Sequence, residues 1–366
     1  MSADLVTLAA DAAARQAPPL RFQRPWWKAY FGTPLNAVVT VSCILVSTRL
    51  APPLWDWAIG SAVFHGDAKA CHAPGAGACW AFIAEKLPFM LFGFYPPAEQ
   101  WRPLTVVVLF VALMAFSLRP SAWKPWLFAV WLATVGLFYL LLAGGVPGLA
   151  AQPSRNWGGL PITILLSTVG LGLALPIGIA LALGRTSRLP MIRVLSVGYI
   201  ELIRGVPLIS LLFMASVVFP LFLPAGLNLD KLVRAQAAFT LCAAAYLAEV
   251  VRGGLQGVQR GQYEAADALG LGYARKMGLV VLPQALRLVI PALVSTIIGF
   301  FKDTTLVVVV GIFDFLTTIR AALSDSNWLG FAPEAYVFAA SVYFVICFGL
   351  SRYGLQIERH FRLRAH

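Results

Sequence analysis

Charged side chains are scarce in this sequence, and acidic ones are the scarcest. Aspartate and glutamate account for 16 of 366 residues, and all charged residues together make up 12%. The mean hydropathy is +0.78 and 59% of the residues are hydrophobic, which is more apolar surface than a soluble domain can bury. The shortage of charge therefore argues against a water-soluble fold and favours a chain that lies in a lipid bilayer.

Residues for enzyme chemistry are also missing. The histidines are His65, His72, His360 and His366, all expected in loops or the tail, so a catalytic triad built on histidine is not expected. Neither the phosphate loop G-x-x-x-x-G-K-[ST] nor the zinc motif H-E-x-x-H occurs. We therefore expect no catalytic residue, no bound metal and no cofactor on this chain. If the chain belongs to a transporter, an ion gradient or a separate ATPase must supply the energy.

The sequence instead contains long apolar runs. A helix needs roughly 20 apolar residues to cross the hydrocarbon core. About eight runs approach that length, at 34–50, 102–118, 125–143, 160–183, 194–223, 232–251, 285–312 and 334–351. The predicted fold is all-α and transmembrane with about eight spanning helices. No cleavable signal peptide is expected before the first run.

The positive charge is distributed as membrane topology requires. The net charge is +12, and most of the 28 lysines and arginines fall on one side if the eight runs alternate across the membrane. Basic segments lie at both ends, including Arg15, Arg21 and Arg24 near the start and Arg364 near the end. Because basic loops stay in the cytoplasm, we expect both termini there. The charge is assigned to topology and lipid contact, and no nucleic-acid partner is expected.

Cysteines fall into two groups. Cys43, Cys242 and Cys347 lie inside apolar runs and are expected to behave as small apolar residues. Cys71 and Cys79 lie in the segment CHAPGAGAC, which the topology places outside the cytoplasm, where disulfides persist. We favour a disulfide between them over a metal site, because a fourth metal ligand is missing.

The chain divides into two regions whose predicted spans differ in their content of charged and polar residues. Residues 1–157 give a basic tail and three spans with an outer loop of about 50 residues, and their spans carry almost no charge. This region is interpreted as an accessory three-helix module. Residues 158–366 hold five spans, nearly all the polar residues within spans, and a cytoplasmic loop at 252–287.

Charges within the second region are the candidates for lining a pathway. Each charged group inside a membrane costs at least ~2.5–3.5 kcal/mol, so Lys302 and Asp303 in mid-span need partners or water. Glu201 and Arg204, and likewise Glu249 and Arg252, are three residues apart and can each form a contact along a helix. A surface ion pair near the inner interface is the alternative for both pairs. The candidates are Glu201, Arg204, Glu249, Lys302, Asp303, Thr304 and Thr305.

The stretch 264–283, EAADALGLGYARKMGLVVLP, is polar and interrupted although it lies between two apolar runs. It is expected to form two short helices that turn at Gly270 and Gly272, the second ending near Pro283. Such a pair outside the bilayer offers a docking surface. An ordinary interfacial hairpin is the alternative.

This stretch resembles the signature E-A-A-x3-G-x9-I-x-L-P of binding-protein-dependent ABC importer permeases. The matching positions are Glu264, Ala265, Ala266, Gly270, Leu282 and Pro283, with Val280 where isoleucine is usual. The flanking segments ELIRGVPL and FKDTTLVVVVGIFD are similar to the polar-amino-acid branch of that family. The three added N-terminal spans resemble the M-type permease of the general L-amino-acid importer.

The resemblance implies a five-helix permease core in a bacterial inner membrane. It further implies a related permease as partner in a heterodimer, two cytoplasmic ATPase subunits that bind ATP and magnesium, and a periplasmic amino-acid-binding protein. In that family the E-A-A loop inserts into a groove of the ATPase. Two other functions are weighed, an ion-coupled secondary carrier that uses Lys302 and Asp303, and a structural subunit whose partner binds the substrate.

Overall fold

A computed structural model describes residues 26–224 and 229–363. The basic residues Arg15, Arg21, Arg24 and Arg364 lie outside these ranges, so the predicted tails are not described. Within them the chain forms helices and no β-strand, apart from three isolated bridges. The predicted all-α fold is confirmed.

Seven helical segments of the described chain are long and apolar enough to cross a membrane, or up to eight if a bent pair counts as one. The helices are α3 (Pro34–Trp55), α6 (Trp101–Ser117), α7 (Trp126–Ala143), α8 (Gly159–Arg185), α11 (Lys231–Gly257), α15 (Ile290–Asp303) and α17 (Ala332–Leu363). This agrees with the predicted count of about eight.

The run expected at 194–223 is not one continuous helix. It forms α9 (Pro190–Gly205) and α10 (Leu208–Phe213), and the axes bend by 102° at the break. Proline disfavours helical geometry in the residue before it, and Val206 before Pro207 is indeed extended, with φ −111° and ψ 132°. After α10 the chain continues as the π-helical turn η5 (Met214–Val218) and the 3-10 turn η6 (Phe219–Phe222).

The described chain separates into two compact units. One unit comprises residues 26–62 and 73–78, and the other comprises 63–72, 79–224 and 229–363. The smaller unit holds α2 (Trp26–Phe31), α3 and the π-helical turn η1 (Asp56–Gly60). Helix α3 starts at Pro34 behind a capping threonine, Thr33, whose side chain accepts a hydrogen bond from the Asn36 backbone.

In the larger unit, the loop expected between the first two spans contains ordered helices. These are α4 (Ala68–Cys71) and α5 (Trp80–Phe92). Helix α5 packs against α8 and against another short helix, α16 (Phe315–Ala322). Phe82 of α5 is fully buried, with its ring 5.8 Å from the rings of Trp328 and Phe331. Helix α5 has only 13 residues. It is therefore shorter than the roughly 20 residues that a spanning helix needs.

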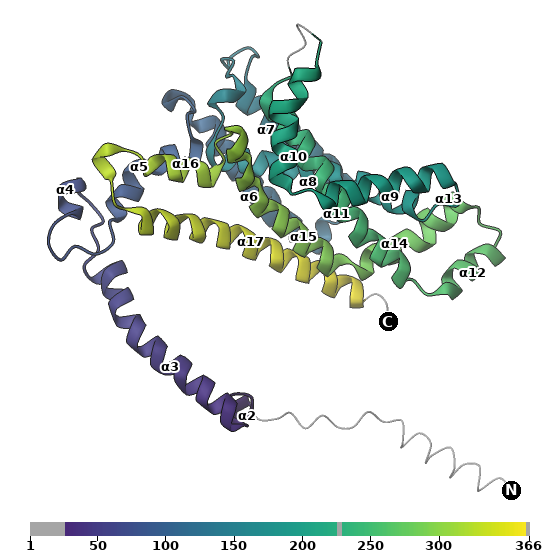
Figure 1. Cartoon of the computed structure of the whole chain (residues 1–366), viewed down its shortest axis with the longest axis horizontal. Coiled ribbons are helices and arrows are strands. Elements are labelled where there is room, and N and C mark those ends of the chain that lie inside the picture. The colour runs from purple at the N-terminus through teal and green to yellow at the C-terminus, as the bar shows by residue number, and fades with distance from the viewer. Residues whose placement is uncertain (1–25, 225–228, 364–366) are drawn as a thin grey trace. The chain divides into compact units, whose positions relative to one another are not determined.

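Helices α8 and α11 form the most extensive contact in the larger unit, and small residues make it possible. Ala174 and Ala182 of α8 are fully buried. A Cβ atom added at Gly178 would lie 3.0 Å from the Ala244 carbonyl oxygen of α11. Small residues at four-residue spacing therefore let the two backbones approach closely. Figure 1 shows these helices together with α12, α13 and α14, which gather beyond the end of α11.

Candidate functional site

The E-A-A stretch forms a compact turn after α11. Helix α12 (Arg260–Ala268) is followed by α13 (Tyr273–Arg275), the π-helical turn η7 (Lys276–Val281) and α14 (Leu282–Leu288). Gly270 has φ +69° and stands in open space, so the turn needs the left-handed conformation that glycine adopts at low cost. The second helix does not end near Pro283 as expected. Pro283 lies in the first turn of α14, where a missing N–H costs nothing.

One face of this hairpin is anchored to the helices beneath it. Ala266 is 2% exposed and Val281 is fully buried. The Tyr263 hydroxyl donates a hydrogen bond to the Leu255 carbonyl of α11 at 3.0 Å. Within the hairpin itself, Lys276 lies 2.6 Å from the Asp267 carboxylate. Burial raises the pKa of Tyr263 although Lys276 acts to lower it, so the phenol stays protonated at neutral pH and can donate this bond.

The opposite face of the hairpin is exposed. Glu264 and Ala265 are exposed on α12, next to the buried Ala266. Leu269 and Leu279 are 78% and 71% exposed. Leu282 and Pro283 are half-buried at the start of α14. The surface therefore combines the carboxylates of Glu264 and Asp267 with large apolar side chains, a composition typical of a protein-docking surface.

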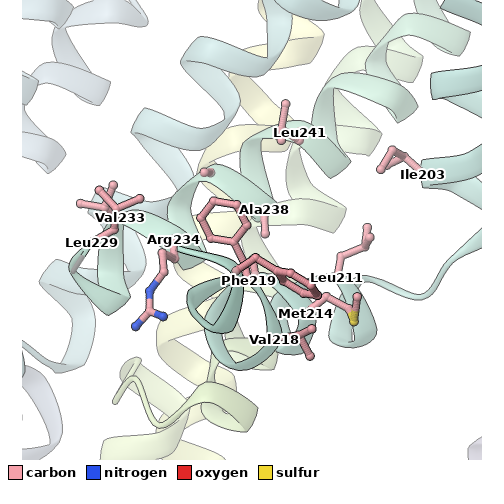
Figure 2. A pocket seen from close by; sticks show the side chains of 13 residues that line it. Ile203, Leu211, Met214, Val218, Phe219, Leu229, Val233, Arg234, Ala238 and Leu241 are labelled. Carbon is pink, nitrogen blue, oxygen red and sulfur yellow. The ribbon is translucent and has the colours of Figure 1, made fainter. Parts of the chain in front are cut away.

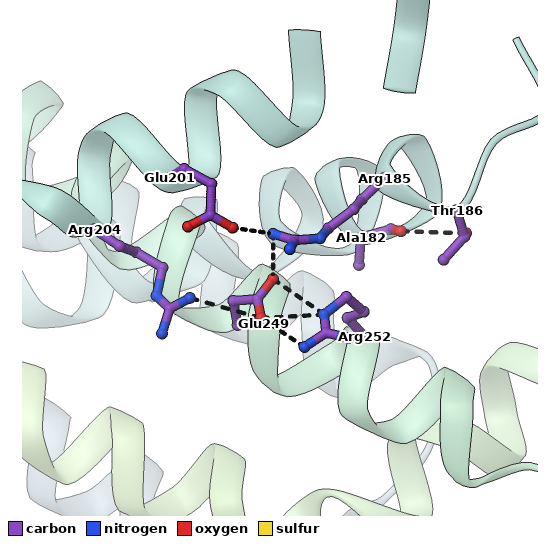
Figure 3. Close-up of polar contacts among 7 residues, drawn as sticks. All are labelled: Ala182, Arg185, Thr186, Glu201, Arg204, Glu249 and Arg252. Carbon is purple, nitrogen blue, oxygen red and sulfur yellow. Dashed lines mark hydrogen bonds and ion pairs between the residues drawn. The ribbon is translucent and has the colours of Figure 1, made fainter. Parts of the chain in front are cut away.

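Five charged residues meet where α8, α9 and α11 come together (Figure 3). The Glu249 carboxylate lies 2.8 Å from Arg185, 2.9 Å from Arg252 and 3.6 Å from Arg204. Glu249 is 15% exposed, so these contacts are shielded from water. We call this group the Glu249 cluster, and its members are Arg185, Glu201, Arg204, Glu249 and Arg252.

The pairing in the Glu249 cluster differs in part from the prediction. The expected contact between Glu249 and Arg252 is present. The expected contact between Glu201 and Arg204 is wrong, because Glu201 binds Arg185 at 2.8 Å and Arg204 turns towards Glu249. The bend between α9 and α10 brings the end of α9 to α8 and α11, and a single straight span would not predict that meeting. Arg185 was not among the residues predicted from the sequence to pair within this region.

The polar group in α15 is split by the local helix geometry. Helix α15 ends at Asp303, and the chain continues as the 3-10 helix η8 (Thr304–Val310). Thr304 is fully buried and its hydroxyl donates to the Phe301 carbonyl at 2.8 Å. Lys302 is exposed, whereas Asp303 and Thr305 are half-buried. Within the described ranges, neither Lys302 nor Asp303 makes an ion pair within 4.0 Å.

Asp303 is the member of this polar group that lines a cavity. The cavity measures about 260 Å³, and its lining includes Tyr246, Cys242 and Phe300 as well as Asp303. The guanidinium of Arg204 lies 5.5 Å from the centre of the Tyr246 ring. Tyr246 therefore lines the cavity together with Asp303 and also contacts Arg204 of the Glu249 cluster. Lys302, Thr304 and Thr305 are not among the lining residues.

A larger cavity of about 500 Å³ lies beside α10 and α11 and is almost wholly apolar (Figure 2). Arg234 is the one charged side chain among its 13 lining residues. It donates to the Ser216 carbonyl at 2.8 Å, while its Nε has no hydrogen-bond partner in the described chain. The sequence analysis missed Arg234, although a charge inside the predicted run 232–251 was a signal for it.

The outer-loop cysteines are joined to each other in the structure. Cys71 and Cys79 form a disulfide with a Cα–Cα distance of 5.5 Å. The Cys79 backbone donates to the Glu334 carboxylate at 3.0 Å, and Glu334 is only 4% exposed. His72 packs its ring 5.0 Å from that of Phe331. In the described residues no group of three or more potential metal ligands occurs. The sequence analysis missed Glu334, because its partner is a backbone group 255 residues away.

Comparison with known proteins gives a consistent family. The model of the binding-protein-dependent transport system inner membrane component matches residues 174–362. The inner membrane amino-acid ABC transporter permease protein YhdY of Escherichia coli K12 is 45% identical over 338 residues, 91% of each chain. The glutamate/glutamine/aspartate/asparagine transport system permease protein BztC of Rhodobacter capsulatus is 38% identical, over 90% of this chain and 91% of the relative.

A solved structure of an amino acid ABC transporter with histidines is 31% identical, with a TM-score of 0.49. It covers 55% of this chain and 92% of its own.

Proposed function

Because this chain belongs to the family of binding-protein-dependent transport system inner membrane components, we propose that it is the amino-acid-carrying permease of an ABC importer. It is a multi-span membrane protein of a transport family. The names of its relatives, YhdY and BztC, support amino acids as the cargo. The proposal places the chain in a bacterial inner membrane with both termini in the cytoplasm.

The observation that carries the proposal is the geometry of the E-A-A hairpin. Ala266 and Val281 hold one face against the membrane helices, while Glu264 of α12 and Leu269 just after it are exposed. A surface fixed from below and exposed above can transmit a partner's movement to the spans. We assign coupling to the ATPase to Glu264, Ala265, Ala266, Gly270, Leu282 and Pro283, with the buried Ala266 supporting the exposed surface from below.

The cavity beside Asp303 supports a site for the cargo. A zwitterionic amino acid carries an ammonium and a carboxylate group, and each needs an opposite charge when it leaves water. Asp303 lines the cavity, and Arg204 lies over Tyr246 on its wall. In the proposal, Asp303 accepts the ammonium group and Arg204 meets the carboxylate. Lys302, Thr304 and Thr305 then serve the pathway or the partner's surface rather than this cavity.

The partners follow from the family. A related permease completes the pathway as a heterodimer, two ATPase subunits bind ATP and magnesium on the cytoplasmic side, and a periplasmic protein delivers the amino acid. The chain itself carries out no covalent chemistry and binds no cofactor. An ion-coupled carrier is disfavoured because it has no use for a docking hairpin, and the family match supports the importer.

The test of docking compares two glycines of the hairpin. Gly270 has φ +69°, whereas Gly272 has φ −61°, and a Cβ atom would meet nothing within 4 Å at either position. Gly270→Val should therefore distort the turn and Gly272→Val should not. We expect Gly270→Val to abolish the ATP hydrolysis that loaded binding protein stimulates in the reconstituted complex, together with uptake.

Charge reversal supplies a second arm of the same test. Glu264→Lys should weaken ATPase docking, while Glu85→Lys on the exposed surface of α5 serves as the matched control. Co-purification with the ATPase and with the partner permease is measured for each variant. Wild-type hydrolysis and uptake in both Gly270→Val and Glu264→Lys complexes would show that the hairpin is not the coupling element.

A further inference from the structure

A separate cavity of about 320 Å³ lies where helices α6 and α7 meet α8, α15 and α17. Apart from Ser167 and Thr168, its lining is aliphatic, aromatic or thioether in character. Both hydroxyls are occupied within their own helix, since Ser167 donates to the Thr163 carbonyl at 2.8 Å and Thr168 to the Ile164 carbonyl at 2.6 Å. Apart from the phenol of Tyr353, the cavity therefore offers no polar group to a ligand, so its occupant must be largely apolar.

The cavity is elongated along the helices. Along α15 its lining extends from Ile290 to Phe301, which corresponds to roughly 16 Å of helix. On α17 it reaches Tyr353 and Ile357, in the half of the helix that the charge distribution predicts to be cytoplasmic. A narrow apolar space of this length, bounded by five spanning helices, suits one hydrocarbon chain and is too small for another helix.

Aromatic side chains lie at the cytoplasmic end of this cavity, and basic residues flank one of them in sequence. Trp123 packs 6.4 Å from Tyr353 of the lining and 4.9 Å from His360, and its indole nitrogen donates to the Ser117 carbonyl. Arg119 and Lys124 flank this tryptophan in sequence and are both exposed. Neither makes a salt bridge among the residues that the structure describes. Tryptophan and unpaired cations mark the depth of lipid headgroups.

We propose that this cavity binds an anionic phospholipid, with one acyl chain between α6, α7 and the α8–α15–α17 helices and its phosphate beside Arg119 and Lys124. Basic pockets between spanning helices on the cytoplasmic side are suited to anionic headgroups. The lipid fills a seam between the N-terminal helices and the helices of the matched family region. The inference concerns this seam and is independent of the cargo and of ATPase docking.

The test uses the whole transporter complex, purified in detergent and given dioleoyl phosphatidylglycerol or dioleoyl phosphatidylcholine. Native mass spectrometry should show phosphatidylglycerol retained at lower lipid concentration than phosphatidylcholine. The Arg119→Gln/Lys124→Gln variant should lose that preference by about tenfold, equal to about 1.4 kcal/mol. The control Arg188→Gln/Arg193→Gln removes two exposed cations near α9, far along the chain, and should keep it.

The acyl-chain site is tested by filling the cavity. Ile297→Trp should reduce retention of both lipids, whereas Leu202→Trp, at a side chain that is 67% exposed on α9, should not. If Ile297→Trp fails to assemble, a phosphatidylglycerol with a photoreactive acyl chain replaces it and should label peptides of α15 in the wild type. Equal retention of both lipids, or labelling that avoids α6, α7, α15 and α17, would overturn the proposal. Uptake by the Gly270→Val variant does not test lipid binding. Failure of the lipid proposal therefore leaves the proposal on ATPase docking intact, and the reverse also holds.

Discussion

The Glu249 cluster and the Lys302–Asp303 pair both place charge among apolar helices, but only the cluster neutralises it. Glu249 has three arginines within 3.6 Å, supplied by three helices. Asp303 has no ion pair within the described chain and faces a cavity of about 260 Å³. Since unpaired charge in a membrane is costly, the first arrangement suits stability and the second suits a ligand or a passing substrate.

Charge alone therefore does not identify a functional site in a membrane protein. Pairing in the Glu249 cluster joins α8, α9 and α11, so its loss should affect folding. An unpaired carboxylate on a cavity wall contributes little to folding, so its loss should affect function. The two regions therefore predict opposite phenotypes for substitutions that remove one charge each.

The largest effect is expected for Glu249→Gln. It leaves three arginines without their shared carboxylate, and removal of one partner from a buried pair costs about 3–5 kcal/mol. The 15% exposure of Glu249 favours the lower end of that range. We expect less folded permease in the membrane and a lower Tm for the purified complex. Glu201→Gln is the control, because Glu201 is 58% exposed and pairs with Arg185 alone. Equal losses in both variants would contradict a special role for Glu249.

Asp303→Asn should give the opposite result. Uptake should fall by about tenfold or more, equal to about 1.4 kcal/mol, while the amount of protein and its Tm stay at wild-type values. The reason is that the amide keeps the shape of the side chain but cannot offset a ligand's ammonium charge. Uptake of labelled amino acids by proteoliposomes measures it. A loss of stability comparable with that of Glu249→Gln would contradict the claim that Asp303 affects function and not folding.

Lys302→Met should have a smaller effect on uptake, of about two- to fivefold. Lys302 is exposed and does not line the cavity beside Asp303, so the substitution removes charge only from the pathway or the partner's surface. Membrane insertion should be retained, as quantified by immunoblot, and Lys302→Arg should behave as wild type. Normal uptake with Lys302→Met would make the charge of this lysine incidental.

The smallest effect concerns an ion pair outside the spans. Lys86 lies 2.6 Å from Asp325, and this hydrogen bond holds the pKa of the Asp325 carboxyl below its usual range. A depressed folded-state pKa contributes stability above the unfolded pKa and loses it as pH falls through the folded value. The Tm difference between wild type and Asp325→Asn should therefore be small at pH 7 and vanish as the pH falls through the lowered pKa of Asp325. A difference that grows on acidification would contradict this sign.

The sequence predicted the regular part of the fold well. Seven of the apolar runs correspond to helices because length and hydropathy decide a span almost alone. The E-A-A hairpin and its glycine turn were also predictable, since Gly270 needs a conformation that other residues avoid. Helix α5 was missed because burial within protein requires no spanning length. The break at Val206 was missed because hydropathy continues across it, although Pro207 was a local signal.

The charge partners were less predictable than the helices. The contact between Glu249 and Arg252 lies within one helix and follows from spacing. Arg185 and Glu334 make contacts across many residues of sequence, which spacing does not reveal. The split of Lys302, Asp303 and Thr304 depends on the change from α-helix to 3-10 helix after Asp303. The residues of that polar stretch have no helix propensity that would predict the change from α-helix to 3-10 helix.

The close contact at Gly178 limits how helices α8 and α11 can move relative to each other. A Cβ atom there would lie 3.0 Å from the Ala244 carbonyl oxygen, and one at Gly170 would lie 2.5 Å from the Phe239 ring. Two backbones that interlock over this length cannot slide or separate without losing the contact along the whole seam. We therefore expect helices α8 and α11 to move together, and any relative motion of the spans to occur at breaks such as the bend at Val206 and the irregular segment after Asp303.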